Sequence, residues 1–328
     1  MSLPVITRCP VTLAEGYDTY SRTGLIRLFG GRKVHHILPY DSPASSPETE
    51  ALFLDNRRRI SISGVQEKYS IVQDKNQLRL AWEGEQSTHI LKPPPMGVKK
   101  AGQLPANEHL TMQIARQVFR VETAENGLVF FQNGQAAYLT RRFDVRADGT
   151  RQGQEDFASL AGRTPQTHGK HYKYQGNYSE LFSLLKRYVP AYRTESVRLL
   201  KVLIFNYLFS NGDAHLKNFS LVETPMGDYR LGPAYDLLNS RIHMDDSDFA
   251  LEDGLLPASQ AQGSLRHRFS ILAELAEIPA TMFAEMMASL LSGSDRVEQL
   301  VNASYLDPTT QRAYWQAYSG RLKQLAKS

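Results

Sequence analysis

The sequence contains a single cysteine, Cys9. One thiol permits no internal disulfide bond and no cysteine-built metal site, which is typical of a protein in a reducing cytoplasm. No apolar run approaches the roughly 18 residues of a membrane-spanning helix. The first residues also lack the basic flank and apolar stretch of a secretory signal. We therefore expect a cytoplasmic protein without a membrane segment.

Two common enzyme signatures are also missing. No Gly-x-Ser-x-Gly segment occurs, so a serine hydrolase of the α/β type is poorly supported. The histidines, among them His35, His36, His168, His171 and His215, include no His-x-x-x-His pair. Zinc is therefore disfavoured as well.

Composition limits the function only weakly. A hydrophobic content of 41% and a charged content of 22% describe an ordinary globular protein. The formal net charge of +4 is compatible with binding ATP, an acidic protein face or nucleic acid. It selects none of these three.

Strand signals dominate the first half of the chain, after an opening stretch that we expect to be irregular up to about residue 60. In that stretch Pro39, Pro43 and Pro47 alternate with serines and indicate a loop or flexible connector. We expect a helix over residues 107–119. Strands are expected at residues 69–72, 78–80, 89–92, 128–131 and 136–139.

From about residue 144 the periodicity becomes helical. Helices are expected at residues 178–188 and 195–209 and again within 268–328, with a small hairpin at 219–222 and 229–231. Strands followed by helices predict an α+β fold. We divide it into an irregular segment (1–60), a β-rich lobe (61–143) and a helical lobe (144–328).

Three polar residues follow the apolar helix predicted at 195–209. Asp213 and Asn218 lie five positions apart, and Asp236 follows eighteen positions after Asn218. A phosphoryl-transfer site needs such groups: one carboxylate accepts the proton of the attacking hydroxyl, while an amide oxygen and a second carboxylate hold Mg²⁺ against the phosphates of ATP. Because Asn211-Gly212 is a strong turn signal, we expect Asp213 and Asn218 on a loop.

Upstream segments fit the same chemistry. Lys92 ends a strand, where a cation on the α- and β-phosphates is needed, and Glu108, at the opening of the next helix, fits as its partner. The loop at 64–68 has a single glycine and indicates phosphate binding only weakly. Residues 141–143 join the two lobes, where adenine would lie. Each feature also has an ordinary explanation, as a strand-end lysine, a first-turn helix acid or a connector.

Together these segments resemble the HipA-like serine/threonine kinase toxins of bacterial toxin–antitoxin systems. Six blocks carry the resemblance in order, at residues 61–68, 90–93, 107–109, 142–144, 211–220 and 233–236. The resemblance implies a two-lobed protein-kinase-like fold with a β-rich N-lobe and an α-helical C-lobe. It also implies ATP and Mg²⁺ as cofactors and a location in the bacterial cytoplasm.

The resemblance assigns roles to individual residues. It implies Asp213 as the proton acceptor, with Asn218 and Asp236 at the metal. The nucleotide-binding residues that it implies are Ser63, Gly64, Val65, Gln66, Glu67 and Lys68 in the phosphate loop, Lys92, then Arg141, Arg142 and Phe143 at the hinge, and finally His215, Leu216, Lys217, Asn218, Tyr235 and Asp236.

Regulation and partners are implied in the same way. Only some sixty residues precede the phosphate loop, as in the short HipT type, whose missing subdomain is a separate small protein. The implied partners are a HipB-like DNA-binding antitoxin, through which DNA is reached only indirectly, a small HipS-like protein, and a substrate protein, for which the resemblance points to an aminoacyl-tRNA synthetase. Related kinases modify a serine at the Ser61 position, so we expect autophosphorylation at Ser61 or Ser63, close to Arg57, Arg58 and Arg59.

Two other functions stay open. Small-molecule phosphotransferases of the antibiotic-kinase type use a similar Asp-x-His-x-x-Asn loop, which Asp213, His215 and Asn218 also fit. A catalytically inactive binding subunit of a DNA-bound complex is a third function. That subunit would need to keep none of the residues Lys92, Asp213, Asn218 and Asp236.

Overall fold

The computed structural model describes residues 5–43, 45–57, 67–146 and 148–327. The chain divides into two units, each assembled from separate stretches of sequence. The first unit comprises Met1–Gln113, Ala124–Thr150 and Gln299–Gln311, and the second Ile114–Thr123, Arg151–Glu298 and Arg312–Ser328. Among the described residues, no helix has the length and apolar character needed to cross a membrane.

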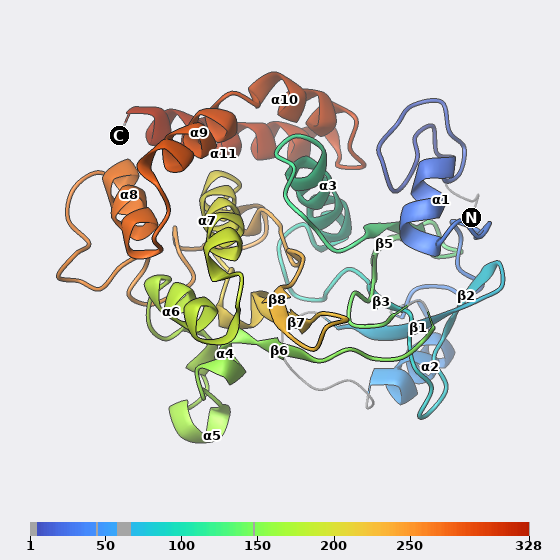
Figure 1. Ribbon diagram of the computed structural model, residues 1–328. Coiled ribbons are helices and arrows are strands. Elements are labelled where there is room, and N and C mark those ends of the chain that lie inside the picture. The colour runs from blue at the N-terminus through green and yellow to red at the C-terminus, as the bar shows by residue number, and fades with distance from the viewer. Residues whose placement is uncertain (1–4, 44, 58–66, 147, 328) are drawn as a thin grey trace. The chain divides into compact units, whose positions relative to one another are not determined.

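A five-stranded antiparallel sheet forms the centre of the first unit (Figure 1). Its strand order is β2-β1-β3-β5-β4. The strands are β1 (Tyr69–Asp74), β2 (Gln77–Leu80), β3 (His89–Lys92), β4 (Asn126–Phe130) and β5 (Ala136–Arg141). All five lie where the sequence predicts a strand. The register pairs Lys92 with Tyr138, which fixes the lysine at the end of a central strand.

Two helices lie where the sequence analysis expects irregular structure, so that expectation is wrong. Helix α1 (Arg22–Phe29) begins after Ser21, whose hydroxyl accepts from Gly24 N at 3.1 Å. Gly30 ends it in the left-handed conformation, with φ of 63°. Both capping residues are local signals of a helix.

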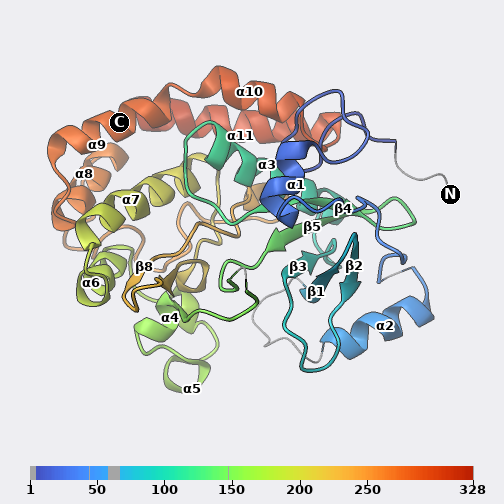
Figure 2. The ribbon, with the colours of Figure 1, turned by 45° about the vertical axis from the view of Figure 1, so that its right-hand side comes forward.

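Helix α2 (Pro47–Arg57) corrects the predicted connector. Its first residue is one of the prolines taken as a loop signal, but proline fits the first turn of a helix, where its missing N–H costs nothing. Phe53 of α2 packs edge-on against Tyr69 of β1, with ring centroids 4.7 Å apart. Figure 2 accordingly shows α2 beside β1.

Helix α3 (Leu104–Gln117) follows the short 3₁₀ helix η1 (Ala101–Gln103) and passes from the residues of the first unit into those of the second. It starts three residues before its predicted beginning at Asn107. Glu108 therefore lies in the second turn of α3 and does not open the helix. The predicted existence of the helix is confirmed, and only its start is wrong.

The second unit is mainly helical. Helix α7 (Tyr192–Leu208) is buried over most of its length, as its apolar sequence predicts, and Phe205 stacks on Phe209 with ring centroids 4.3 Å apart. The other helices are α4 (Phe157–Leu160), α5 (Pro165–His168), α6 (Ser179–Tyr188), α8 (Leu265–Leu275) and α9 (Ala280–Leu291), while α10 (Ser294–Asn302) and α11 (Pro308–Lys327) include residues of both units.

A small antiparallel sheet completes the second unit. It has the order β6 (Gln154–Asp156), β7 (Ser220–Glu223) and β8 (Tyr229–Leu231). The hairpin of β7 and β8 is confirmed within one residue of its predicted bounds. It joins the end of the Asp213–Asn218 loop to the stretch that carries Asp236.

Candidate active site

The Asp213 loop connects α7 to β7. The end of α7 is fixed by a hydrogen bond from Asn211 N to Asn206 O at 2.9 Å, and Ser210 adopts a left-handed φ of 53°. The loop closes with the 3₁₀ helix η3 (Leu216–Asn218). Asp213 therefore stands on a loop, as predicted, whereas Asn218 ends a short helix.

The carboxylate of Asp213 is held by a tyrosine that the sequence analysis missed. Tyr174, in the 3₁₀ helix η2 (Tyr172–Tyr174), donates its hydroxyl hydrogen to Asp213 Oδ1 at 2.8 Å. The Asp213 side chain nevertheless stays 42% exposed. A carboxylate that is oriented and still accessible can accept a proton from an incoming group.

Loss of water around the carboxyl is the largest cause of a raised pKa at Asp213. The Tyr174 hydroxyl and the Lys173 ammonium oppose this rise. The neighbouring carboxylates of Asp246 and Asp236 add to it. Asp213 is thus a better proton acceptor than an isolated aspartate, because burial and the two neighbouring carboxylates destabilise its ionised form.

His215 takes part in a second contact with η2. Lys173 Nζ donates to His215 Nε2 at 2.9 Å, and this geometry requires a histidine nitrogen without a proton. Tyr174 also packs edge-on against the His215 ring, with centroids 5.2 Å apart. Two adjacent residues of η2 therefore fix the loop: Lys173 binds its histidine, His215, and Tyr174 binds its aspartate, Asp213.

Side-chain amides connect the three polar residues that the sequence singled out. Asn218 Nδ2 donates to the backbone oxygen of Asp213 at 3.1 Å. Asn211 Nδ2 donates to the backbone oxygen of Asp236 at 3.2 Å. Asp236 itself has a φ of 54°, a conformation that aspartate and asparagine tolerate better than most residues. The acid, the amide and the second acid are therefore fixed to one another through the backbone.

Three further predicted residues support the loop. Lys217 Nζ forms an ion pair with Asp156 Oδ2 at 2.6 Å. Tyr235 donates its hydroxyl hydrogen to Lys217 O at 2.9 Å. Leu216 is buried. In this structure Leu216, Lys217 and Tyr235 contact neighbouring protein groups and so hold the loop in shape.

The segment after Asp236 returns to Gly212. Gly212 N donates to Ser240 Oγ at 2.9 Å, and Ser240 Oγ donates to Ser210 O at 3.0 Å. A Cβ atom at Gly212 would lie within 2.5 Å of the Ser247 carbonyl oxygen and closer still to the carboxyl of Asp246. Only glycine at position 212 allows the segment of Asp246 and Ser247 to come this close. The close contact brings the carboxylate of Asp246, the third in this region, near Asp213.

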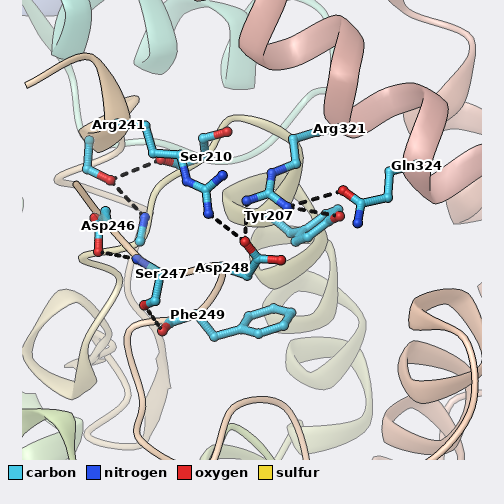
Figure 3. A network of polar contacts seen from close by, with 11 residues as sticks. Tyr207, Ser210, Arg241, Asp246, Ser247, Asp248, Phe249, Arg321 and Gln324 are labelled. Atoms are coloured by element: carbon cyan, nitrogen blue, oxygen red, sulfur yellow. Dashed lines mark hydrogen bonds and ion pairs between the residues drawn. The ribbon is translucent and has the colours of Figure 1, made fainter. Parts of the chain in front are cut away.

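An ion-pair network fixes this returning segment (Figure 3). Asp248 Oδ1 lies 2.5 Å from both Arg241 Nη2 and Arg321 Nη2. Arg321, on α11, is buried and also donates to the Tyr207 hydroxyl at 3.2 Å. Phe249 stacks against the Tyr207 ring of α7, with centroids 5.8 Å apart. Residues from two helices therefore hold the loop that presents Asp246.

In the first unit, Lys92 and Glu108 meet inside the protein. Lys92 Nζ lies 2.6 Å from Glu108 Oε1, and the two side chains are only 4% and 2% exposed. The ammonium group also lies over the Tyr138 ring, 5.2 Å from its centroid. The position of the lysine charge is thus fixed by β3, β5 and α3.

The other predicted residues of the first unit lie at the ends of strands. Arg141 is the last residue of β5, and Arg142 N donates to Thr88 O at 2.9 Å. The Arg142 guanidinium makes two hydrogen bonds to the Asp144 carboxylate, at 3.0 and 2.5 Å. Glu67, just before β1, accepts from the Tyr69 hydroxyl at 2.5 Å. Phe143 and Lys68 are half-buried.

Four residues of the predicted phosphate loop lie outside the described residues, namely Ser63, Gly64, Val65 and Gln66, and so does Ser61, an expected autophosphorylation site. Within the described residues, the second unit brings together Asp213, His215, Asn218, Tyr235 and Asp236, and the first unit brings together Lys92 and Glu108. The described residues contain no group of three or more His, Cys, Asp or Glu side chains placed to hold a metal ion.

Comparison with solved structures shows which known proteins share this fold. The structure resembles one chain of the Shewanella oneidensis complex of HipA, HipB and operator DNA, with a TM-score of 0.59, 22% identity and coverage of 81% of this chain and 64% of that one. It also resembles the Helicobacter pylori proinflammatory kinase CtkA, with a TM-score of 0.52, 11% identity and coverage of 80% and 92%. The fold is therefore the two-lobed α+β fold of kinase-like proteins, as predicted.

The sequence places the chain within that class. Residues 60–300 match the model of the HipA-like C-terminal domain, and the chain belongs to this family. It is 33% identical over 194 residues to the provisionally named kinase Y4mE of Sinorhizobium fredii. It is 28% identical over 206 residues to the serine/threonine-protein kinase toxin HipA of Shewanella oneidensis. These matches cover 57% and 58% of this chain but only 44% and 46% of the relatives, so the chain spans about half of their length.

Proposed function

We propose that the chain is an ATP-dependent serine/threonine protein kinase and the toxin of a toxin–antitoxin system. One observation carries the kinase proposal: the amides of Asn218 and Asn211 tie Asp213 and Asp236 into a single arrangement, at 3.1 and 3.2 Å. A proton acceptor, an amide and a second acid in fixed relation are what phosphoryl transfer requires.

In this mechanism Asp213 accepts the proton of a serine or threonine hydroxyl on the substrate protein. The hydroxyl oxygen then forms a bond to the γ-phosphorus as the bond to ADP breaks. Tyr174 keeps the carboxylate oriented through its 2.8 Å hydrogen bond, and the substrate hydroxyl approaches the exposed side of the carboxylate. Lys92, fixed by Glu108, is proposed to bind the α- and β-phosphates.

A magnesium ion is part of this proposal, and the oxygen atoms of Asn218 and Asp236 are of the kind that Mg²⁺ prefers. Asn218 uses its amide nitrogen on Asp213 O, which leaves the amide oxygen as the group suited to a cation. Asp236 and Asp246 both lie close enough to affect the pKa of Asp213, so negative charge accumulates here. Asn218 and Asp236 would hold Mg²⁺, which would neutralise charge on the phosphates. Adenine would lie at residues 141–143, and the phosphates near residues 63–68.

A first experiment tests the kinase function. The purified protein is incubated with radiolabelled ATP and a bacterial lysate, in parallel with an Asp213→Asn variant. Label on a lysate protein, absent with the variant, is the expected result. Label only on a small molecule would favour the antibiotic-kinase type, and no transfer to any acceptor would contradict the proposal.

The toxin role rests on family membership and on the named HipA relative. We propose a HipB-like antitoxin as partner, with DNA reached only through it, and a small HipS-like protein as a second partner. An aminoacyl-tRNA synthetase is the proposed substrate, because its modification would stop translation. Phosphoproteomics after brief expression tests this, with Asp213→Asn as control; the absence of any synthetase among the new phosphoproteins would rule out the substrate.

Autophosphorylation is proposed at Ser61 or Ser63, both outside the described residues. A phosphate there would add about two negative charges beside the segment proposed to hold the phosphates of ATP, close to the arginines at 57–59. Intact-mass spectra after ATP treatment should show added phosphate that maps to these serines. Phosphate mapping only elsewhere would contradict the proposal.

A further inference from the structure

A cavity of about 280 Å³ lies within the second unit, apart from the acids discussed above. Helix α7 forms one side of it, residues 120–122 another, and the stretch from Leu231 to Leu237 a third. Every lining residue belongs to the second unit. Neither Asp213 nor Asp236 lines it.

Much of the wall is apolar. Val121, Leu199, Val202, Leu231 and Leu237 all contribute to it. An apolar wall of this size favours a ligand with a compact hydrophobic body, since ligand pockets are mostly apolar with a few placed polar groups.

The charged groups of the cavity are not balanced. Arg198 is neutralised by ion pairs of 2.5 Å with both Glu122 and Glu195. By contrast, the side chains of Lys201 and Arg120 form no hydrogen bond or ion pair with any residue that the structure describes. Two positive groups therefore remain in the wall without an acid of their own.

The two unpaired cations also repel each other. Burial lowers the pKa of Lys201, and the positive charge of Arg120 lowers it further. A lysine that loses water and faces a second cation is stabilised by an incoming anion, which supplies the missing opposite charge.

The cavity adjoins the candidate active site. Asn211, Asn218 and Tyr235 line it, and Asn211 also holds the backbone oxygen of Asp236 at 3.2 Å. Asn211, which helps to set the position of Asp236, is therefore also part of the cavity wall. The charged residues of the wall are not those of the candidate active site.

We propose that this cavity is a binding site for a small organic anion, with its acidic group between Lys201 and Arg120 and its hydrophobic body against Val202 and Leu231. The acidic group can be a carboxylate, a sulfonate or a phosphate monoester, since all three offer the same oxygen acceptors to an ammonium and a guanidinium group.

The test uses anilinonaphthalene sulfonate, a fluorescent probe with this chemistry, and phenylnaphthylamine, its analogue without the acidic group. The parent protein should bind one equivalent of the sulfonate. Lys201→Met, which keeps the apolar stem, should weaken binding roughly tenfold, since a charge-assisted hydrogen bond is lost. Arg120→Gln should weaken it about threefold, because Arg120 is exposed.

Matched controls separate the site from general binding. Lys323→Met removes an exposed lysine of the same unit and should leave the affinity unchanged. The neutral analogue should bind the parent and Lys201→Met equally. Equal sulfonate affinity in Lys201→Met and Lys323→Met would overturn the proposal, as would binding of many equivalents without saturation.

The nucleotide site is tested separately. A non-hydrolysable ATP analogue should not compete with the sulfonate for the protein. Competitive displacement would mean that the cavity is part of the nucleotide site, and the proposal would fail. Failure of the protein to bind any nucleotide would contradict the kinase function but leave the result with the probe unaffected.

Discussion

The two units hold their functional charges in opposite ways. In the first, Lys92 and Glu108 are almost completely buried and meet inside the protein. In the second, Asp213 stands on a loop with its side chain 42% exposed and is positioned by Tyr174. The difference follows from what each proposed role requires. A lysine that presents a fixed charge gains from burial with a partner, whereas a proton acceptor must remain accessible to its substrate.

If the two units differ in this way, the largest loss of phosphate transfer is expected from substitutions in the second unit. Asp213→Asn and Asp236→Asn should each reduce phosphate transfer by about three orders of magnitude or more, because the proton acceptor or a metal ligand is lost. Asparagine also suits the left-handed conformation of Asp236. Both variants should unfold in denaturant like the parent. Rates are measured with labelled ATP, and Asp245→Asn, an exposed neighbour, is the control that should keep full activity.

In the first unit, removal of a charge should affect stability as well as activity. Lys92→Ala leaves the buried Glu108 without its ammonium partner, which should lower the free energy of unfolding by about 3–5 kcal/mol and weaken ATP binding. The paired replacement Lys92→Met with Glu108→Leu should cost less than either single change to alanine.

Urea denaturation and calorimetric ATP titration measure these effects. Lys186→Ala serves as control, because its pair with Glu277 is exposed and should not contribute measurably. If Lys92→Ala behaves like this control in both assays, Lys92 is only a strand-end lysine.

Buried histidines give the first unit a distinct response to pH. Loss of water lowers the pKa of His89 and His109 to about 4, below the ordinary value of 6.5. Between these values the unfolded chain binds protons that the folded protein does not, so stability falls as the pH drops from about 6.5 toward 4. The expected loss at pH 5 is about 2 kcal/mol for each histidine.

Unfolding free energies at pH 7 and pH 5 test this expectation. His89→Gln should remove about half of the pH dependence, whereas His267→Gln, at an exposed site, should leave it intact. The same pH dependence in both variants would show that other groups cause the loss.

The smallest effect is expected at Tyr174. Tyr174→Phe removes the hydrogen bond to Asp213, so phosphate transfer should fall by less than about tenfold. The hydroxyl lowers the pKa of Asp213, and its loss should raise that pKa. The acidic limb of the rate profile should therefore move to higher pH. A profile with an unchanged limb would assign Tyr174 a purely structural role; Tyr172→Phe is the matched control.

The sequence predicts the elements that local patterns encode. The apolar run of α7 and the short strand-forming runs of β1 and β3 are sufficient to locate these elements. The two helices before residue 60 are not predicted. Pro47 counts there as a loop signal although it fits a helix start, and Ser21, which caps α1, carries no prediction. Composition alone does not distinguish a proline or serine in a loop from one at the start of a helix.

The site could be predicted only in part, for a related reason. Asp213 and Asn218 are five positions apart in one motif, so a local pattern reveals them. Tyr174 lies 39 positions before Asp213, in a segment without helical or strand periodicity, and Asp246 follows on a returning loop. Their contacts depend on how distant segments pack, and a single sequence does not encode this in a local pattern.

The ion pair between Arg321 and Asp248 has a consequence for the order of events during synthesis. The two residues are separated by 73 positions, and Asp248 leaves the ribosome first. The segment that presents Asp246 beside Gly212 therefore has no buried arginine to hold it until α11 has been made. A partly synthesised chain would carry the Asp213 loop without this support. Completion of α11 thus sets the earliest moment at which the site can reach its final form.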